Sequence, residues 1–422
     1  MSDIEKMEKR LTDSTILVVG AGIAGISVAA ALAEAGASTV IIEKEPWIGG
    51  RVMRVAKYFP KLCPPTCGME IHGRRLFENP RIRVMVNTIL KDANKTEQGW
   101  RVTLETGPAF VSDACTGCAE CISACPQSAP NPFNSGMNAM KAIGFVHPDV
   151  RPFRPLLMRG ECENNCRECE TRCPVGAIDL QAEATQKELV VKTIVAATGW
   201  RPYDMSLLPL YGAGKLENVI SSATMERLAS PAGPTGGKIL KADGTPPKKM
   251  AFVQCAGSRD VQHLPFCSEV CCAASLKQVS YVKAQIPDAE VTVYYIDRRF
   301  PGRNETMLTD AVAGETCRFV KGKVAKVAKQ DKRLRLRVED AECATVMDAE
   351  ADMVVLALGM VPNHCANPLP LPFPTDENGF IWSNPDDGLI AAGTSRAPMD
   401  VASTVRDATG AAMDALICSL EL

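Results

Sequence analysis

Cysteine is concentrated in two short segments in the middle of the chain. The first reads CTGCAECISACP, from Cys115 to Pro126, and the second reads CENNCRECETRCP, from Cys162 to Pro174. Each ends in Cys-Pro after cysteines spaced three or four residues apart, the pattern by which a polypeptide binds two iron–sulfur cubanes. The competing interpretation is zinc, which usually takes two CxxC pairs separated by a longer spacer. The triple at short intervals favours iron–sulfur clusters and therefore one-electron transfer.

The spacing also predicts which cysteines share a cluster. Three closely spaced thiolates surround one cubane, while the cysteine beside the proline reaches the neighbouring cluster. The second run has one extra residue between its first two cysteines, which a bulged loop can absorb. The predicted ligands are Cys115, Cys118, Cys121 and Cys173 for one cluster and Cys162, Cys166, Cys169 and Cys125 for the other.

A third group of cysteines lies much later, in CAGSRDVQHLPFCSEVCC. It comprises Cys255, Cys267, Cys271 and Cys272. Buried cysteines can serve as small apolar filler, but packing alone gives no reason for four in so short a span, two of them adjacent. We therefore predict a third iron–sulfur cluster here.

One further pair, Cys63 and Cys67, is separated by Pro-Pro-Thr. A redox-active disulfide is one interpretation of this pair. The intervening prolines favour a structural or accessory-ligand role instead.

A glycine-rich loop near the N-terminus can bind a dinucleotide. It reads GAGIAG from Gly20 to Gly25, between the apolar strand ILVVG and a small-residue helix, and the strand STVIIE then ends at Glu43. Such glycines allow a tight turn and close approach to a pyrophosphate, whose charge meets the helix N-terminus, while the acidic residue binds a ribose hydroxyl. The predicted contacts in this unit are Gly20, Gly22, Ala24, Gly25, Glu43 and Lys44.

At least two α/β domains must position these groups. Residues 79–106 predict short strands, and the same sheet resumes at 188–199, so the double cysteine run interrupts one domain through a β-meander. A second α/β unit begins at Lys248 but lacks GxGxxG, which argues against nicotinamide binding there. The predicted boundaries are 12–107, 185–246 and 364–422 for the dinucleotide-binding domain, 108–184 for an inserted two-cluster ferredoxin-like domain, and 247–363 for the second Rossmann-like domain.

Composition narrows the partners and the compartment. The 422 residues include 47 Lys and Arg against 49 Asp and Glu, and no basic stripe predicts a nucleic-acid surface. The polar N-terminus and the clustered cysteines predict a reducing, cytoplasmic location. The apolar stretch 16–33 fits strand, turn and helix better than a membrane span, so we expect membrane contact only through partners.

Three further segments resemble the flavin site of two-dinucleotide-domain flavoproteins of the thioredoxin and disulfide reductase type. They are Gly-Gly-Arg at 49–51, the strand ending in Ala-Thr-Gly at 197–199, and AAGTSRAPMDVAST at 391–404. The resemblance implies an α/β fold of this type, here with an inserted bacterial-type ferredoxin domain, and FAD in the first site. This chain has Gly393-Thr394 where the family often has Gly-Asp, and amides at the start of the last helix are expected to reach the flavin carbonyl. The implied contacts are Gly50, Arg51, Ala197, Thr198, Gly199, Gly393, Thr394, Val401 and Thr404.

The whole pattern, with CAGSRD and CSEVCC replacing the second glycine loop, resembles the HdrA flavin subunits of heterodisulfide reductases. Within that group it looks most like the QmoA type of the quinone-interacting membrane-bound oxidoreductases of sulfate-reducing bacteria. The resemblance implies an oxidoreductase subunit that carries FAD, two [4Fe-4S] clusters in the insert and a third [4Fe-4S] cluster. Such a subunit would pass electrons between menaquinol and adenylylsulfate reductase in dissimilatory sulfate reduction.

The same resemblance implies the partners. They are a homologous flavin and iron–sulfur subunit (QmoB-like), a membrane haem and iron–sulfur subunit (QmoC-like) and adenylylsulfate reductase, at the inner face of the cell membrane. Two alternatives stay open: the flavin subunit of a heterodisulfide-reductase-type complex, bifurcating or not, and an NAD(P)H-dependent disulfide reductase that uses Cys63 and Cys67.

Overall fold

A five-stranded parallel sheet forms the centre of the first domain. The computed structural model describes residues 15–163, 165–307, 310 and 317–421. Alternating burial along the strands places apolar residues on both faces of this sheet, as expected for parallel strands covered on both sides. The strand order is β21 (Leu389–Ala391), β11 (Thr193–Ala196), β1 (Thr15–Val19), β2 (Ser38–Ile42) and β3 (Ile82–Met85).

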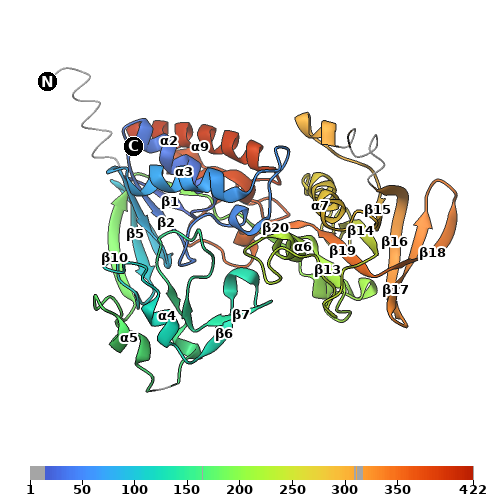
Figure 1. Cartoon of the computed structure of the whole chain (residues 1–422). Helices are drawn as coiled ribbons and strands as arrows, with labels where there is room; N and C mark the ends of the chain where they lie inside the picture. The colour runs from blue at the N-terminus through green and yellow to red at the C-terminus, as the bar shows by residue number, and fades with distance from the viewer. Residues whose placement is uncertain (1–14, 164, 308–309, 311–316, 422) are drawn as a thin grey trace.

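Helices α2 (Ile23–Glu34) and α9 (Val401–Glu421) lie side by side on one face of this sheet, next to α3 (Pro65–Phe77) (Figure 1). Alanines of α2 and α9 belong to one buried core. Small side chains let two helices approach closely, so the first and last helices of the chain together support the glycine loop that precedes α2.

A three-stranded antiparallel sheet covers the other end of the first domain and carries the insertion. It is formed by β4 (Thr88–Thr96), β5 (Gly99–Thr106) and β10 (Thr185–Val191). β5 and β10 pair from Thr106 opposite Thr185, so the chain leaves and re-enters the domain at one rung of this ladder.

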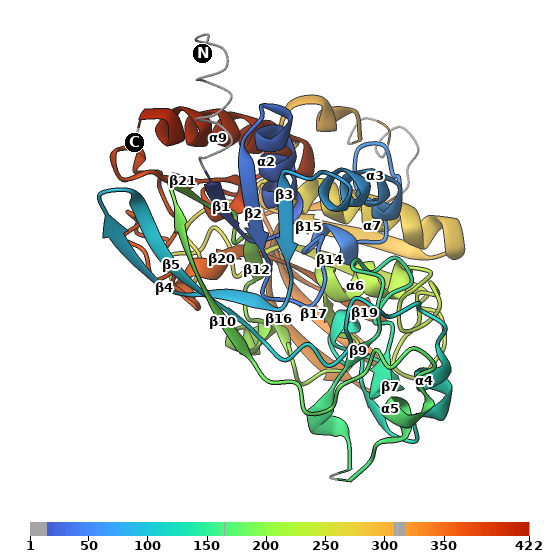
Figure 2. The ribbon, with the colours of Figure 1, turned by 90° about the vertical axis from the view of Figure 1, so that its left-hand side faces the viewer.

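The inserted segment contains two short helices and several short strands, seen below the first domain in Figures 1 and 2. Phe133, Val146 and Val150 pack into the core of the first domain, so the insert is joined to that domain by apolar contacts as well as by the chain. Its elements are α4 (Glu120–Ala124), β6 (Ser128–Pro130), η2 (Pro132–Asn134), β7 (Ala139–Lys141), β8 (Ile143–Gly144), β9 (Leu156–Leu157), η3 (Arg159–Glu161) and α5 (Glu168–Arg172).

The second domain is built on a seven-stranded sheet whose last two strands, β17 and β18, are antiparallel. Helices α6 (Ser222–Ala229) and α7 (Cys271–Gln285) pack on one face of it. We predicted that the helix after the cysteine loop would begin near Ser275; it begins four residues earlier, so Cys271 and Cys272 form its first turn. The strand order is β13 (Val219–Ser221), β19 (Met353–Leu358), β14 (Lys249–Ala256), β15 (Glu290–Tyr295), β16 (Arg318–Gln330), β17 (Arg333–Asp340) and β18 (Thr345–Ala351).

The two domains are connected by the antiparallel pair β12 (Trp200–Pro202) and β20 (Met360–Pro362). This arrangement confirms the predicted mixed α/β class. None of the helices in the described part of the chain is long and apolar enough to cross a membrane.

Candidate iron–sulfur and flavin sites

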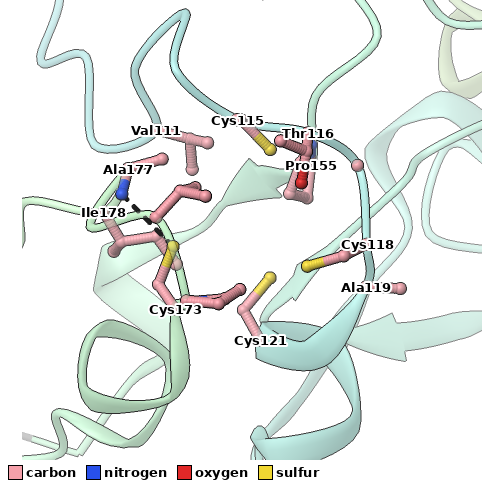
Figure 3. Close-up of a pocket in the computed structure, with 13 residues that line it drawn as sticks. Val111, Cys115, Thr116, Cys118, Ala119, Cys121, Pro155, Cys173, Ala177 and Ile178 are labelled. Carbon is pink, nitrogen blue, oxygen red and sulfur yellow. Dashed lines mark hydrogen bonds between the residues drawn. The ribbon is translucent and has the colours of Figure 1, made fainter.

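Four cysteines from both halves of the insert line one cavity. The loop before α4 supplies Cys115 and Cys118, α4 itself supplies Cys121, and Cys173 comes from the end of α5. In Figure 3 their sulfur atoms face a common space of about 340 Å³. This is the set that the spacing predicts for one cluster, including the cysteine that crosses over from the second run.

The second predicted set also gathers in the insert. The pKa of Cys169 is raised by burial and, more weakly, by the charges of Cys162, Cys125 and Cys166, which places all four thiols within electrostatic reach of one another. Cys121 and Cys169 influence each other in the same way, so the two sets adjoin.

The two halves of the insert repeat one local structure. Each short helix ends on the cysteine that precedes proline, with φ and ψ of −70° and 119° at Cys125 and −71° and 112° at Cys173. The helix starts differ, because Ala119 has φ of 65° whereas Arg167 has φ of −130°. The difference falls just after the extra residue of the second run, in the loop where the sequence requires an accommodation.

Electrostatics in the first cavity fits a metal cluster. Burial raises the pKa of Cys121 to about 11, and neighbouring Cys115, Cys169 and Cys118 add to the effect. Four thiolates can share such a site only with a compensating cation, and bound iron deprotonates its cysteine ligands. The backbone N–H of Ala177 already donates to Cys173 Sγ at 3.2 Å, the kind of contact that tunes cluster potentials.

The third cysteine group lines a second cavity, of about 310 Å³. The carboxyl end of β14 supplies Cys255, the following loop Cys267, and the first turn of α7 Cys271 and Cys272. Backbone N–H groups of Glu269 and Arg299 donate to Cys267 Sγ at 3.4 Å and Cys272 Sγ at 3.5 Å.

The position of this second cavity explains the missing glycine loop. In a Rossmann unit the loop between the first strand and its helix binds the pyrophosphate at the helix N-terminus. Here that loop and the first turn of α7 carry thiols, of which Cys255 has its pKa raised to about 11 by burial and by Cys272. Arg259 and Arg299 both pair with Asp297 at the rim. The electrostatics therefore again fits a cationic metal centre.

No three His, Cys, Asp or Glu side chains in the described ranges meet closely enough to hold a single metal ion. The cysteines of the first and third groups are instead spread around cavities.

Close packing explains two glycines of the dinucleotide loop. A Cβ on Gly25 would lie 1.8 Å from the carbonyl oxygen of Gly20, and one on Gly20, whose φ is 106°, would lie 2.4 Å from that of Ala197. Gly22, by contrast, faces open space at the N-cap of α2. Ala197, predicted from the Ala-Thr-Gly segment, therefore contacts the loop directly.

The acidic residue at the end of β2 is held against this loop. Glu43 is buried and accepts hydrogen bonds from the backbone N–H groups of Ala21, at 2.8 Å, and Glu45, at 3.0 Å. Burial outweighs these bonds and raises its pKa. Lys44 is exposed, so the structure brings Glu43 but not the Lys44 side chain into the loop.

Two further groups near the loop fit an anionic dinucleotide. The pKa of Arg51 is lowered to about 10 by burial and by Arg54, and its guanidinium stacks over Trp200 at 4.6 Å. Such a cation gains from a pyrophosphate. The Thr198 hydroxyl is buried without a hydrogen-bond partner among the described residues, as expected of a group that contacts a cofactor. The residues present therefore fit FAD.

The C-terminal segment closes the same site. A Cβ on Gly393 would lie 2.6 Å from Ala24 Cβ, which joins this turn to the start of α2, and Thr394 lies near Gly199. Asp407 of α9 accepts a hydrogen bond from the Gly393 backbone N–H at 2.6 Å and pairs with Arg396 at 2.8 Å. Sequence reasoning missed this carboxylate.

The start of α9 is also more specific than predicted. Asp400 accepts from the Ser403 backbone N–H at 2.7 Å, and the Thr404 N–H donates to the Asp400 carbonyl at 2.8 Å. Of the amides expected to reach the flavin, those of Val401 and Ala402 are left for a ligand. The signal for this cap, Asp400 three residues before Ser403, was present in the sequence.

Cys63 and Cys67 are free thiols at the start of α3, and Cys67 is exposed. The bound state of this pair, disulfide or ligand, stays a prediction.

Comparisons with known proteins agree with this geometry. Residues 18–89 match the family model described as an NAD(P)-binding Rossmann-like domain. The fold resembles thioredoxin reductase from T. acidophilum, with a TM-score of 0.53 and 13% identity over 96% of this chain and 97% of that one. Thioredoxin reductase from Lactococcus lactis gives 0.53 and 12% over 97% and 100%. The fold is therefore that of the thioredoxin reductase type of flavoprotein.

Sequence relatives are more specific. The A-type subunit of H(2):CoB-CoM heterodisulfide,ferredoxin reductase from Methanothermobacter marburgensis is 34% identical over 96% of this chain and 64% of that protein. The first of the A-type iron–sulfur subunits of CoB–CoM heterodisulfide reductase from Methanopyrus kandleri is 35% identical over 99% and 66%. The chain is thus homologous to the A-type subunits of heterodisulfide reductases along nearly all of its length and spans about two thirds of theirs.

Proposed function

We propose that this chain is a flavin and iron–sulfur electron-transfer subunit of a heterodisulfide-reductase-type complex. The observation that carries the proposal is the gathering of twelve cysteines into three groups of four around a thioredoxin-reductase-type flavin domain. The relatives that share this chain's sequence are the A-type subunits of such reductases.

The side chains divide the work between binding and tuning. The glycine loop, Glu43, Arg51 and the Gly393 turn would hold FAD, and the three cysteine groups would hold [4Fe-4S] clusters. A bound flavin supplies two-electron chemistry and each cluster carries one electron. The protein contributes N–H donors to cysteine sulfur and a buried, water-poor setting, as at Cys173 and Cys272.

Anaerobic analysis of iron, sulfide and flavin tests the proposal. We expect about twelve iron atoms and one FAD per chain, because each cubane holds four irons. The variant Cys121→Ser should remove about four irons and leave the flavin in place. Zinc instead of iron, or a chain without flavin, would contradict the proposal.

The narrower assignment, a QmoA-type subunit linking menaquinol to adenylylsulfate reductase, is the second candidate. Under it, QmoB-like and QmoC-like partners would attach the chain to the membrane. The relatives support the heterodisulfide branch more directly. Native co-purification discriminates the two: a membrane haem subunit would favour the menaquinol route, and a heterodisulfide reductase catalytic subunit the other.

A further inference from the structure

Two buried polar side chains beside the third cysteine group have no hydrogen-bond partner among the described residues. Gln254 is 7% exposed and neither atom of its amide is paired, and Ser275 is 1% exposed with an unpaired hydroxyl. A buried polar group without a partner costs about 1–3 kcal/mol. These two groups are therefore expected to bond to something other than protein.

The strand places Gln254 toward α7. Along β14, Met250 and Phe252 pack in the core beneath α6 and α7, whereas Ala251 and Val253 face the opposite core. Alternation therefore directs Gln254 to the α7 side. β14 then bulges, because Val253 pairs with Leu356 and Ala256 with Leu358, which leaves two residues of β14 opposite one of β19.

The bulge brings a cysteine next to that amide. The two bulged residues are Gln254 and Cys255, and Cys255 has φ of 56°, a left-handed conformation that re-aims its side chain. The cysteine thereby joins Cys271 and Cys272 in the second cavity. Gln254 is thus adjacent in the chain to one predicted ligand and faces the helix that carries two others.

The helix places Ser275 at the same level. It follows Cys271 by four residues and Cys272 by three, so it lies on their side of α7, one turn further in. Val279 and Val282 continue that side into the core with Phe252. Ser275 and Gln254 consequently lie between the third cysteine group and the apolar core.

We propose that Gln254 and Ser275 donate hydrogen bonds to sulfur atoms of the third cluster and raise its reduction potential. The inference rests on the proposed function, in which Cys255, Cys267, Cys271 and Cys272 bind that cluster. Donors to cluster sulfur stabilise the more negative, reduced state, so two such donors favour electron acceptance at this centre. The amide Nε2 of Gln254 and the Oγ of Ser275 are the donating atoms.

The test is a redox titration of the anaerobically purified full chain, followed by electron paramagnetic resonance, with iron counted in each sample. Gln254→Leu keeps the approximate volume without donors, and Ser275→Ala removes one oxygen atom. We expect both variants to lower the midpoint potential of the third cluster alone. Ser275→Thr, which keeps the hydroxyl, should restore it.

A matched control is Thr39→Val, which removes another buried, unpaired hydroxyl far from the cysteine groups, in β2. It should leave all cluster potentials unchanged. A water molecule held by Gln254 and Ser275 would make the variants alter stability but not potential, and that outcome overturns the proposal. If Gln254→Leu loses four irons, the potential of Ser275→Ala decides.

The result separates two failures. A wild-type chain with about eight irons and no third signal removes the third cluster from the proposed function. Twelve irons with potentials that do not respond to either variant keeps the cluster and rejects the donors.

Discussion

Gly22 and Gly25 belong to one loop but lack a side chain for different reasons. Alanine at position 25 would strike a backbone carbonyl, whereas alanine at position 22 meets no protein atom within 4 Å and needs no unusual φ, which is −74° there. The first glycine therefore serves the space outside the protein, and the second serves the fold.

We predict that Gly22→Ala folds normally but binds FAD at least about tenfold more weakly, a loss of about 1.4 kcal/mol, because its methyl group enters the space of the pyrophosphate. Flavin per chain, flavin affinity and the thermal midpoint are measured together. Gly410→Ala is the matched control, since Gly410 also faces open space, in α9. Unchanged flavin affinity in Gly22→Ala would contradict the predicted site.

A single histidine gives the fold a pH dependence. Burial, assisted by Arg227, lowers the pKa of His147 from 6.5 to about 4, while Asp149 opposes the shift weakly. The unfolded chain therefore binds an extra proton between about pH 6.5 and 4, and folding stability falls as the pH falls through that window. Above pH 6.5 this group contributes no dependence.

The expected loss from this histidine is about 1 kcal/mol between pH 7.5 and 5.5. Urea unfolding of wild type and His147→Asn at both pH values measures it. The variant should show a smaller difference between the two pH values, and equal differences in both proteins would refute the assignment.

At the scale of elements, α6 joins three parts of the molecule through adjacent residues. Glu226 accepts hydrogen bonds from the Ala56 backbone N–H and from Gln278 of α7, and it pairs with buried Lys277 at 3.0 Å. Arg227 donates to Asn134 of the insert at 2.8 Å. One turn of helix therefore fixes the flavin domain, the second domain and the insert relative to one another.

Removing Glu226 should be costly. Glu226→Ala leaves the Lys277 ammonium, which is 3% exposed, buried without its carboxylate, and we expect a loss of about 3–5 kcal/mol of unfolding free energy. The double variant Glu226→Ala/Lys277→Met should recover part of that loss. A double-mutant cycle in denaturant measures the coupling, and a single variant within about 0.5 kcal/mol of wild type would show that the junction is not held by this pair.

Local patterns in the sequence predict the elements better than the contacts between them. The glycine loop and its flanking strand and helix follow from spacing alone, and so do the strands around the insert. The start of α7 was placed too late, because four cysteines gave no helical periodicity. Asp407 beside Gly393 could not be foreseen, since the two are brought together only by the packing of α9 against the first helix.

At the scale of the whole molecule, the second domain keeps a Rossmann sheet but carries thiols where a nicotinamide dinucleotide would place its pyrophosphate. We predict that NADH reduces the flavin of the purified chain far more slowly than dithionite does. Stopped-flow absorbance of the flavin measures both rates. Rapid reduction by NADH that Cys63→Ser abolishes, with iron content unchanged, would support the disulfide reductase alternative.

The insert is attached like a removable loop, since its two ends face each other at Thr106 and Thr185. Its interior, however, completes the neighbouring core: Phe133 packs on Trp47 with ring centroids 5.9 Å apart, and the Arg151 carbonyl accepts a hydrogen bond from the Ile48 N–H. A shortened chain that joins 106 to 185 by a tight turn would keep every strand of the flavin domain yet expose that apolar surface. The module is therefore entrenched: a lineage that acquired it could not lose it by simple deletion without first rebuilding the surface around Trp47.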